Sequence, residues 1–175
     1  LGLNATDLGL LFSAFFWTYA LSQIPTGLIL DRWGVTRVGR WSACLWGIAS
    51  AATALAGGLV SLIVARAMLG IAEAPSFPAN SKATGYWFPR KERASSTAIF
   101  DAAAKFSNVI GVPFFAFTIV RFGWRWGFGL AALCSFAYFI AFYRIYRDPS
   151  AHPDLTAEER NYIAAGGAAP EGQLS

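Results

Sequence analysis

Charged residues are scarce in this sequence. Asp, Glu, Lys and Arg make up 14% of its 175 residues, while 55% are hydrophobic; ordinary soluble domains contain about 25% charged residues. Mean hydropathy is +0.44. This composition argues against a soluble domain and indicates an integral membrane protein. The net charge of +4 does not indicate nucleic-acid binding, because the basic residues form short clusters between apolar runs, where they act as topology signals.

Cysteine and histidine are also rare. Cys44 and Cys134 lie in apolar segments without a CxxC pattern, and His152 is the sole histidine. We therefore expect no disulfide framework, no metal site and no cofactor. The sequence contains no recognisable nucleophile paired with a base and no phosphate-binding loop. We therefore expect that the protein is not an enzyme and has no catalytic residue. With no initiator methionine and no signal peptide, we expect the chain to be part of a longer protein.

Long charge-poor runs predict an all-α integral membrane fold with five transmembrane helices. Leu8 to Leu30 contains no charged residue, and at about 1.5 Å per residue it is long enough for a hydrocarbon core of roughly 30 Å. Gly57-Gly58 divides the next apolar region, because a glycine pair breaks a helix. The predicted spans are residues 8–30, 38–56, 60–87, 94–120 and 125–143.

The clusters of basic residues predict which side each connection faces. Two turns and the end of the last span would share one side, with eight basic residues: Arg32, Arg37, Arg40, Arg90, Lys91, Arg93, Arg144 and Arg147. The opposite side has Arg121 and Arg125. The positive-inside rule places the richer side in the cytoplasm and residue 1 outside, which leads us to expect a preceding helix. The polar tail 148–175 would be cytoplasmic and partly disordered, with a capping box at Thr156 and Glu159 that starts a short helix.

An arginine and a glutamate stand inside the third apolar run. Arg66 and Glu73 are seven residues apart and therefore share one face of a helix. Burying both is costly unless they are paired or solvated by a cavity, so they either line a transport pathway or form a structural pair. Pro75 and Pro78 remove amide donors and predict a helix break beside Glu73. Gly70 and Ala74 would let another helix approach closely.

Further polar residues lie in the first and fourth spans. Tyr19, Gln23 and Thr26 form a stripe that serves either helix-to-helix hydrogen bonding or substrate contact. Asp101 and Lys105 are spaced as a helical acid–base pair, and they either bond to each other or line a pathway. Asn108 lies one turn further along the same helix. We count Tyr19, Gln23, Lys105 and Asn108 as candidate substrate contacts.

Two motifs resemble those of a known family. Gly27-Leu-Ile-Leu-Asp31-Arg32-Trp-Gly34-Val-Thr-Arg37 resembles the signature loop between the second and third helices of the major facilitator superfamily. Arg66-Ala-Met-Leu-Gly70-Ile-Ala-Glu73-Ala74-Pro75 resembles the fourth-helix motif in the form typical of the anion:cation symporter family. Trp87-Phe88-Pro89 and Glu92-Arg93 are also characteristic of that family. The resemblance implies that residues 1–147 are a partial N-terminal bundle, helices two to six of twelve, and that 148–175 begin the central linker.

This resemblance also implies a function. Family members carry organic anions such as aldonates, aldarates and hexuronates, or aromatic carboxylates, usually by proton symport and alternating access. The expected partners are therefore an organic anion, a proton with Na⁺ as the alternative, the lipid bilayer, and the missing first helix and second half of the same transporter. The expected location is the bacterial inner membrane. A uniporter and a non-transporting membrane protein remain alternatives.

The same resemblance assigns roles to individual residues. Glu73 resembles the acid that takes up and releases the coupled proton, and Arg66 the arginine that binds the carboxylate of the substrate, for which its planar fork is suited. Tyr19 resembles a substrate-contacting tyrosine. The signature loop and the next turn imply a cytoplasmic gate made by Gly27, Asp31, Arg32, Gly34, Arg37 and Arg93.

Three positions depart from the family pattern. Val35 and Thr36 stand where basic residues are common, so we expect a gate that holds less tightly. Ala104 replaces a polar residue such as glutamine, and Lys105 beside it offers a second anion contact. The substrate class therefore stays open between sugar acids and aromatic carboxylates.

Overall fold

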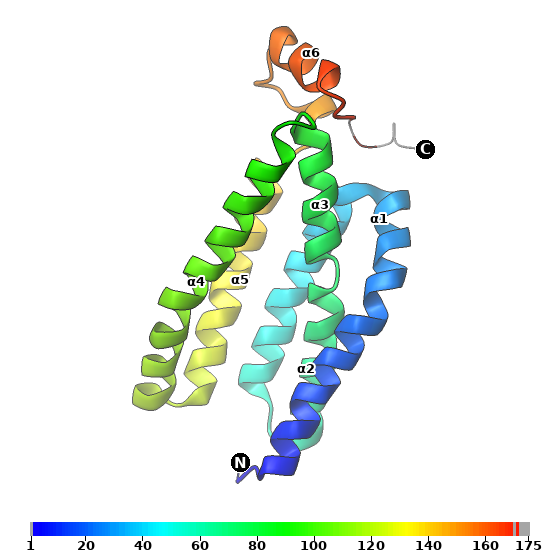
Figure 1. Ribbon diagram of the computed structural model, residues 1–175. Helices are drawn as coiled ribbons and strands as arrows, with labels where there is room; N and C mark the ends of the chain where they lie inside the picture. The colour runs from blue at the N-terminus through cyan, green and yellow to red at the C-terminus, as the bar shows by residue number, and fades with distance from the viewer. Residues whose placement is uncertain (1, 170, 172–175) are drawn as a thin grey trace.

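The computed structural model describes residues 2–169 and 171, which contain helices and no strand (Figure 1). The helices are α1 (Ala5–Leu55), α2 (Leu59–Glu73), α3 (Ser76–Trp87), α4 (Arg93–Phe122), α5 (Trp124–Ile145), the short 3-10 helix η1 (Pro149–Ala151) and α6 (Ala157–Ala165). Four stretches of the described chain are long and apolar enough to cross a membrane: α1, Leu59–Trp87, α4 and α5. The all-α membrane fold expected from the composition is confirmed.

The first of these stretches, α1, is two helical arms folded back on each other. Its 51 residues would extend about 77 Å if straight, more than twice the hydrocarbon thickness of roughly 30 Å. The reversal occurs at Gly34, whose φ of 76° and ψ of 167° are non-helical, a region that is essentially restricted to glycine. Figure 1 shows the first arm (5–33, blue) and the second arm (35–55, cyan) running in opposite directions.

Near Gly34, the helix ends differ from the predicted span limits. The predicted spans 8–30 and 38–56 left a turn of several residues between them, whereas helix continues on both sides up to the bend at Gly34. One glycine with positive φ reverses the chain, so no longer loop is needed. The start of α1 matches its capping signals: Asn4 and Asp7 form a reciprocal capping box, with backbone-to-side-chain bonds of 3.0 and 2.9 Å.

The helix α2 packs directly onto the first arm of α1. A Cβ atom added at Gly70 would lie 2.2 Å from Thr18 Oγ1 and 2.5 Å from the carbonyl oxygen of Phe15. Such contacts are possible only for glycine, because any larger residue would push the two backbones apart. Ala74 is fully buried. The predicted close approach is confirmed at Gly70.

One end of the bundle gathers the predicted basic connections. The Gly34 bend, the turn from α3 to α4 and the tail with α6 all lie at the upper end of Figure 1, while the links before α2 and before α5 lie at the lower end. The predicted tail helix forms, and Thr156 and Glu159 make its capping box. The tail also docks: Arg90 N donates to Gly166 O at 2.9 Å, and Tyr162 Oη donates to Glu92. Residues 170 and 172–175, part of the region expected to be disordered, lie outside the described residues.

Most large apolar side chains face outward. Phe12, Trp17 and Phe106 are among the many that are more than half exposed, and Thr118 alone is buried among the residues of α4. The buried clusters are small: Leu30, Val35, Val38 and Tyr86 at one end, and Leu11, Ala56 and Leu62 at the other. An apolar exterior around a small core suits a chain surrounded by lipid or by other membrane helices.

Candidate functional site

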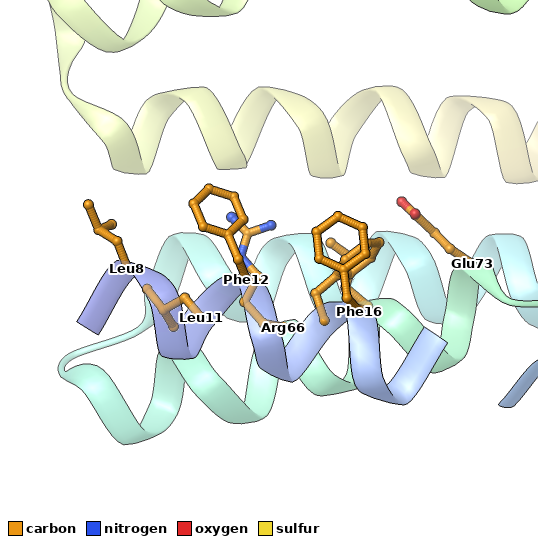
Figure 2. Close-up of a pocket in the computed structure, with 8 residues that line it drawn as sticks. Leu8, Leu11, Phe12, Phe16, Arg66 and Glu73 are labelled. Carbon is orange, nitrogen blue, oxygen red and sulfur yellow. The ribbon is translucent and has the colours of Figure 1, made fainter. Parts of the chain in front are cut away.

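Arg66 and Glu73 line one pocket. Both belong to α2, and the pocket, with a volume of about 310 Å³, is closed by Leu69 and by the first arm of α1. Figure 2 shows the two side chains leaving α2 on the same side, with Phe12 beside the guanidinium of Arg66. The arm contributes five apolar side chains: Leu8, Leu11, Phe12, Phe15 and Phe16. The predicted shared face is therefore present, and it opens into a mainly apolar cavity that holds one cation and one acid.

No ion pair joins Arg66 to Glu73. Among the described residues the one ion pair is between Lys82 and Asp31, at the other end of the bundle. The guanidinium of Arg66 instead lies over the ring of Phe128 from α5, with 4.6 Å between its Cζ atom and the ring centre. Neither Arg66 nor Glu73 is fully buried. Each therefore remains available to a charged or polar group that enters the pocket.

The helix breaks beside Glu73 as the prolines predicted. Glu73 is the last residue of α2, Ala74 and Pro75 form a turn, and α3 begins at Ser76. Pro78 falls in the first turn of α3, where an amide would have no helical partner. Next to the break, Ser42 Oγ of the second arm donates a 2.5 Å hydrogen bond to the carbonyl oxygen of Ala72. Sequence reasoning missed Ser42, which carries no motif.

The other predicted substrate contacts do not line this pocket. Tyr19 is half-buried on the first arm and stacks on Phe15, with 5.9 Å between ring centres. Gln23 lies one turn further along the same arm and is also half-buried. Lys105 and Asn108 are exposed on α4, which packs mainly against α5 and α3. Lys105 and Asp101 form no ion pair in the described part of the chain.

A second, polar cavity lies at the end that carries the signature loop. Its volume is about 450 Å³, and Asp31, Arg32, Gly34 and Arg37 of the predicted gate line it. Gly27, the first residue of the motif, lies outside this lining. The Lys82 ammonium from α3 makes an ion pair with Asp31. Sequence reasoning missed Lys82, although a signal existed, since it is the one charged residue between Glu73 and Arg90.

The structure does not bring Arg93 to Asp31. The guanidinium of Arg93 donates to three carbonyl oxygens, of Gly85 at 3.1 Å, Phe88 at 3.2 Å and Gly167 at 2.9 Å. It therefore ties the end of α3 to the segment after α6, and among the described residues it forms no hydrogen bond or ion pair with the signature loop. The gate network expected from the resemblance is divided into two sets, one around Asp31 and Lys82 and one around Arg93.

Glu171 in the tail reaches the signature loop. Its carboxylate accepts a 3.1 Å hydrogen bond from Thr36 Oγ1, and its backbone N donates to Asp148 Oδ2 at 2.8 Å. The same carboxylate occupies the space over Gly34, where an added Cβ would lie 1.0 Å from Glu171 Oε1. Burial raises the pKa of Glu171, and the bond from Thr36 opposes this effect. Thr36 stands where the resemblance leads us to expect a basic residue, and its hydroxyl group donates a hydrogen bond to the carboxylate of Glu171 in the tail.

Comparison with known proteins identifies the family. The family model described as Major Facilitator Superfamily matches residues 1–171. Together with several helices able to cross a membrane, this match shows that the chain belongs to the major facilitator superfamily and is a multi-pass integral membrane protein.

Three relatives from Escherichia coli narrow the comparison. The chain is 37% identical to a probable galactarate/D-glucarate transporter, GudP of strain K12, over 96% of this chain and 39% of that protein. It is 33% identical to a D-galactonate transporter of strain O6:H1, over 98% of this chain and 40% of that protein. It is 34% identical to a hexuronate transporter of strain K12, over 95% of this chain and 38% of that protein. The chain thus spans about two fifths of the length of these curated relatives.

Proposed function

We propose that this chain is part of a secondary active transporter that carries an organic anion, such as a sugar acid, in symport with a proton. The observation that carries the proposal is the pocket in which Arg66 and Glu73 project from one face of α2 without pairing. A structural pair would have its two charges in contact, so this separation favours a working pathway over the structural alternative. The relatives named for galactarate, D-glucarate, D-galactonate and hexuronate support an anionic sugar-acid substrate.

In the proposed mechanism, the two charged residues share one task. Arg66 binds a carboxylate of the substrate, which its planar fork can hold through two parallel hydrogen bonds. Glu73 takes up a proton on the side of higher proton concentration and releases it on the other. A protonated Glu73 leaves Arg66 to the substrate, whereas an ionised Glu73 competes for it. Because Glu73 ends α2 at a proline-induced break, a change in the helix angle there would alter the access of its carboxyl group.

The end with the signature loop would be the cytoplasmic gate. The cluster of basic connections at that end supports a cytoplasmic orientation through the positive-inside rule. On this proposal the described helical arms are helices two to six of twelve, the tail begins the central linker, and the membrane is the bacterial inner membrane. The first helix and the second half of the transporter complete the pathway.

One observation favours a second candidate substrate. The pocket wall includes the rings of Phe12, Phe15 and Phe16, which suit the ring of an aromatic carboxylate better than the hydroxyl groups of a sugar acid. Arg66 would bind the carboxylate in either case. A panel that contains both classes of acid therefore decides between them.

The test is uptake by cells that make the full-length transporter. Labelled D-glucarate, D-galactonate, D-glucuronate and benzoate are supplied with and without a proton gradient, to wild type, Arg66→Lys and Arg66→Gln. We expect wild type to concentrate at least one acid in a gradient-dependent way, Arg66→Lys to have a raised KM, and Arg66→Gln to lose uptake. Glu158→Gln on α6, an exposed acid remote from the pocket, is the control. Equal uptake by Arg66→Gln and wild type would contradict the proposal.

A further inference from the structure

An aromatic residue of α5 lies against the guanidinium of the pocket arginine. The Arg66 Cζ atom lies 4.6 Å from the ring centre of Phe128, well inside the roughly 6 Å range in which a cation is attracted to the face of a ring. The two residues come from helices α2 and α5. Phe128 carries no motif, and its ring is half-buried.

The ring of Phe128 is itself held by its neighbours. Trp124, one turn earlier, meets it edge to face, with 6.4 Å between ring centres and 70° between planes. Trp124 packs against the buried cluster of Leu11, Ala56 and Leu62. Arg125 lies over the Trp124 ring at 4.8 Å and donates a 3.0 Å hydrogen bond to the carbonyl oxygen of Ala56. The position of Phe128 is therefore fixed by the core at that end of the bundle.

This contact has a consequence for the charges in the pocket. A cation–π contact does not require the N–H donors of a guanidinium, so those donors stay available for a carboxylate. Without the ring, the acid nearest to Arg66 along its own face of α2 is Glu73, roughly 10 Å away along the axis. Two flexible side chains can close much of such a gap, and an ion pair between them would occupy the site.

We propose that Phe128 is a positioning residue for Arg66, holding its guanidinium away from Glu73 and ready for the carboxylate of the substrate. The inference rests on the proposed function, because it assumes that Arg66 binds an organic anion. It adds a residue of α5 to a site otherwise built by α1 and α2.

The test measures initial transport rates of the full-length protein in proteoliposomes over a range of concentrations. The probe is whichever of D-glucarate, D-galactonate, D-glucuronate and benzoate wild type transports fastest. Phe128→Leu removes the aromatic face, and Phe128→Tyr retains it. Phe139→Leu is the matched control, because Phe139 is a half-buried aromatic residue of the same helix. Its ring packs against the ring of Tyr143, with 6.1 Å between ring centres.

We expect Phe128→Leu to raise KM by about three- to thirty-fold, with a smaller change in kcat per folded transporter. Phe128→Tyr and Phe139→Leu should keep a KM close to that of wild type. An unchanged KM in Phe128→Leu, or an equal loss of affinity in Phe128→Tyr, would overturn the inference. If Phe128→Leu does not fold, Phe128→Met replaces it under the same criteria. If wild type transports none of the four acids, the proposed function fails, and this inference fails with it.

Discussion

Lys82 of α3 and Asp31 of the first arm form an ion pair at the end of the bundle that carries the signature loop. Their side chains are 30% and 63% exposed, so the pair contributes on the order of 0.2–1 kcal/mol to stability. Its importance lies in position, because it joins the helix that follows the Glu73 break to the proposed gate. A change of angle at the break would displace Lys82 relative to Asp31.

The ion pair can be tested by reversing its charges. Lys82→Asp should place two acids side by side and reduce the thermal stability of the purified transporter and its uptake rate, because like charges repel. Asp31→Lys should have a similar effect. The double variant, which restores opposite charges, should recover part of both properties, and the coupling is read from the double-mutant cycle. Additive losses would show that the two residues do not interact.

Gly34 should tolerate no side chain. Its φ of 76° with ψ of 167° disfavours any other residue, and a Cβ there would collide with the carboxylate of Glu171. Gly34→Ala should lower the free energy of unfolding by about 1–3 kcal/mol, with a corresponding fall in the thermal midpoint. Gly111→Ala on α4, where an added Cβ meets nothing within 4 Å, is the control. A neutral Gly34→Ala would contradict the bend geometry.

Gly70 should be similarly sensitive for a different reason. Its φ is not unusual, but an added Cβ would lie 2.5 Å from a backbone oxygen of the first arm, which cannot rotate away. Gly70→Ala should therefore cost about 1–3 kcal/mol, as overpacking commonly does. The comparison is Gly85→Ala on α3, where the added Cβ has free space. If both substitutions have the same effect on the thermal midpoint, the close helix contact is not present.

The docking of Glu171 should weaken as the pH rises. Burial raises the pKa of this carboxyl group, so the docked state binds more protons than the free tail, and stability falls with increasing pH. The contribution is complete below the ordinary pKa of about 4.3 and is lost as the pH passes the raised value. The carboxylate of Glu171 also accepts a hydrogen bond from the backbone N–H of Thr36. Protection of this amide against hydrogen exchange, corrected for the intrinsic rate, should therefore follow the same pH dependence. It should disappear in Glu171→Gln, and a dependence that persists there would assign it to another group.

The sequence predicted the features that depend on local chemistry. The apolar runs predicted membrane helices, the spacing of Arg66 and Glu73 predicted a shared face, and Pro75 predicted the break. Each prediction follows from helix geometry or from the N–H donor that proline lacks. Neither requires knowledge of neighbouring elements.

Contacts between elements were harder to predict. The family resemblance placed Arg93 in one gate with Asp31, and no motif marked Lys82 as the partner of Asp31. Tertiary packing brings Lys82 to Asp31 and directs Arg93 to backbone carbonyl oxygens instead. Glu171 and Phe128 carry no motif, and their roles follow from the side chains that the fold places beside them. The predicted helix limits near Gly34 were wrong because a single glycine with positive φ can reverse the chain without a longer loop.

In the proposed mechanism, Glu73 couples proton movement to anion transport. The most direct measurement compares wild type with Glu73→Gln in proteoliposomes, using the acid that wild type concentrates, under two regimes: accumulation driven by a proton gradient, and exchange of labelled for unlabelled acid without a gradient. Glu73→Gln should lose accumulation and retain exchange, because a neutral glutamine resembles the protonated carboxyl group and permits substrate binding but cannot release a proton. Gradient-driven accumulation by Glu73→Gln at the wild-type level would contradict it.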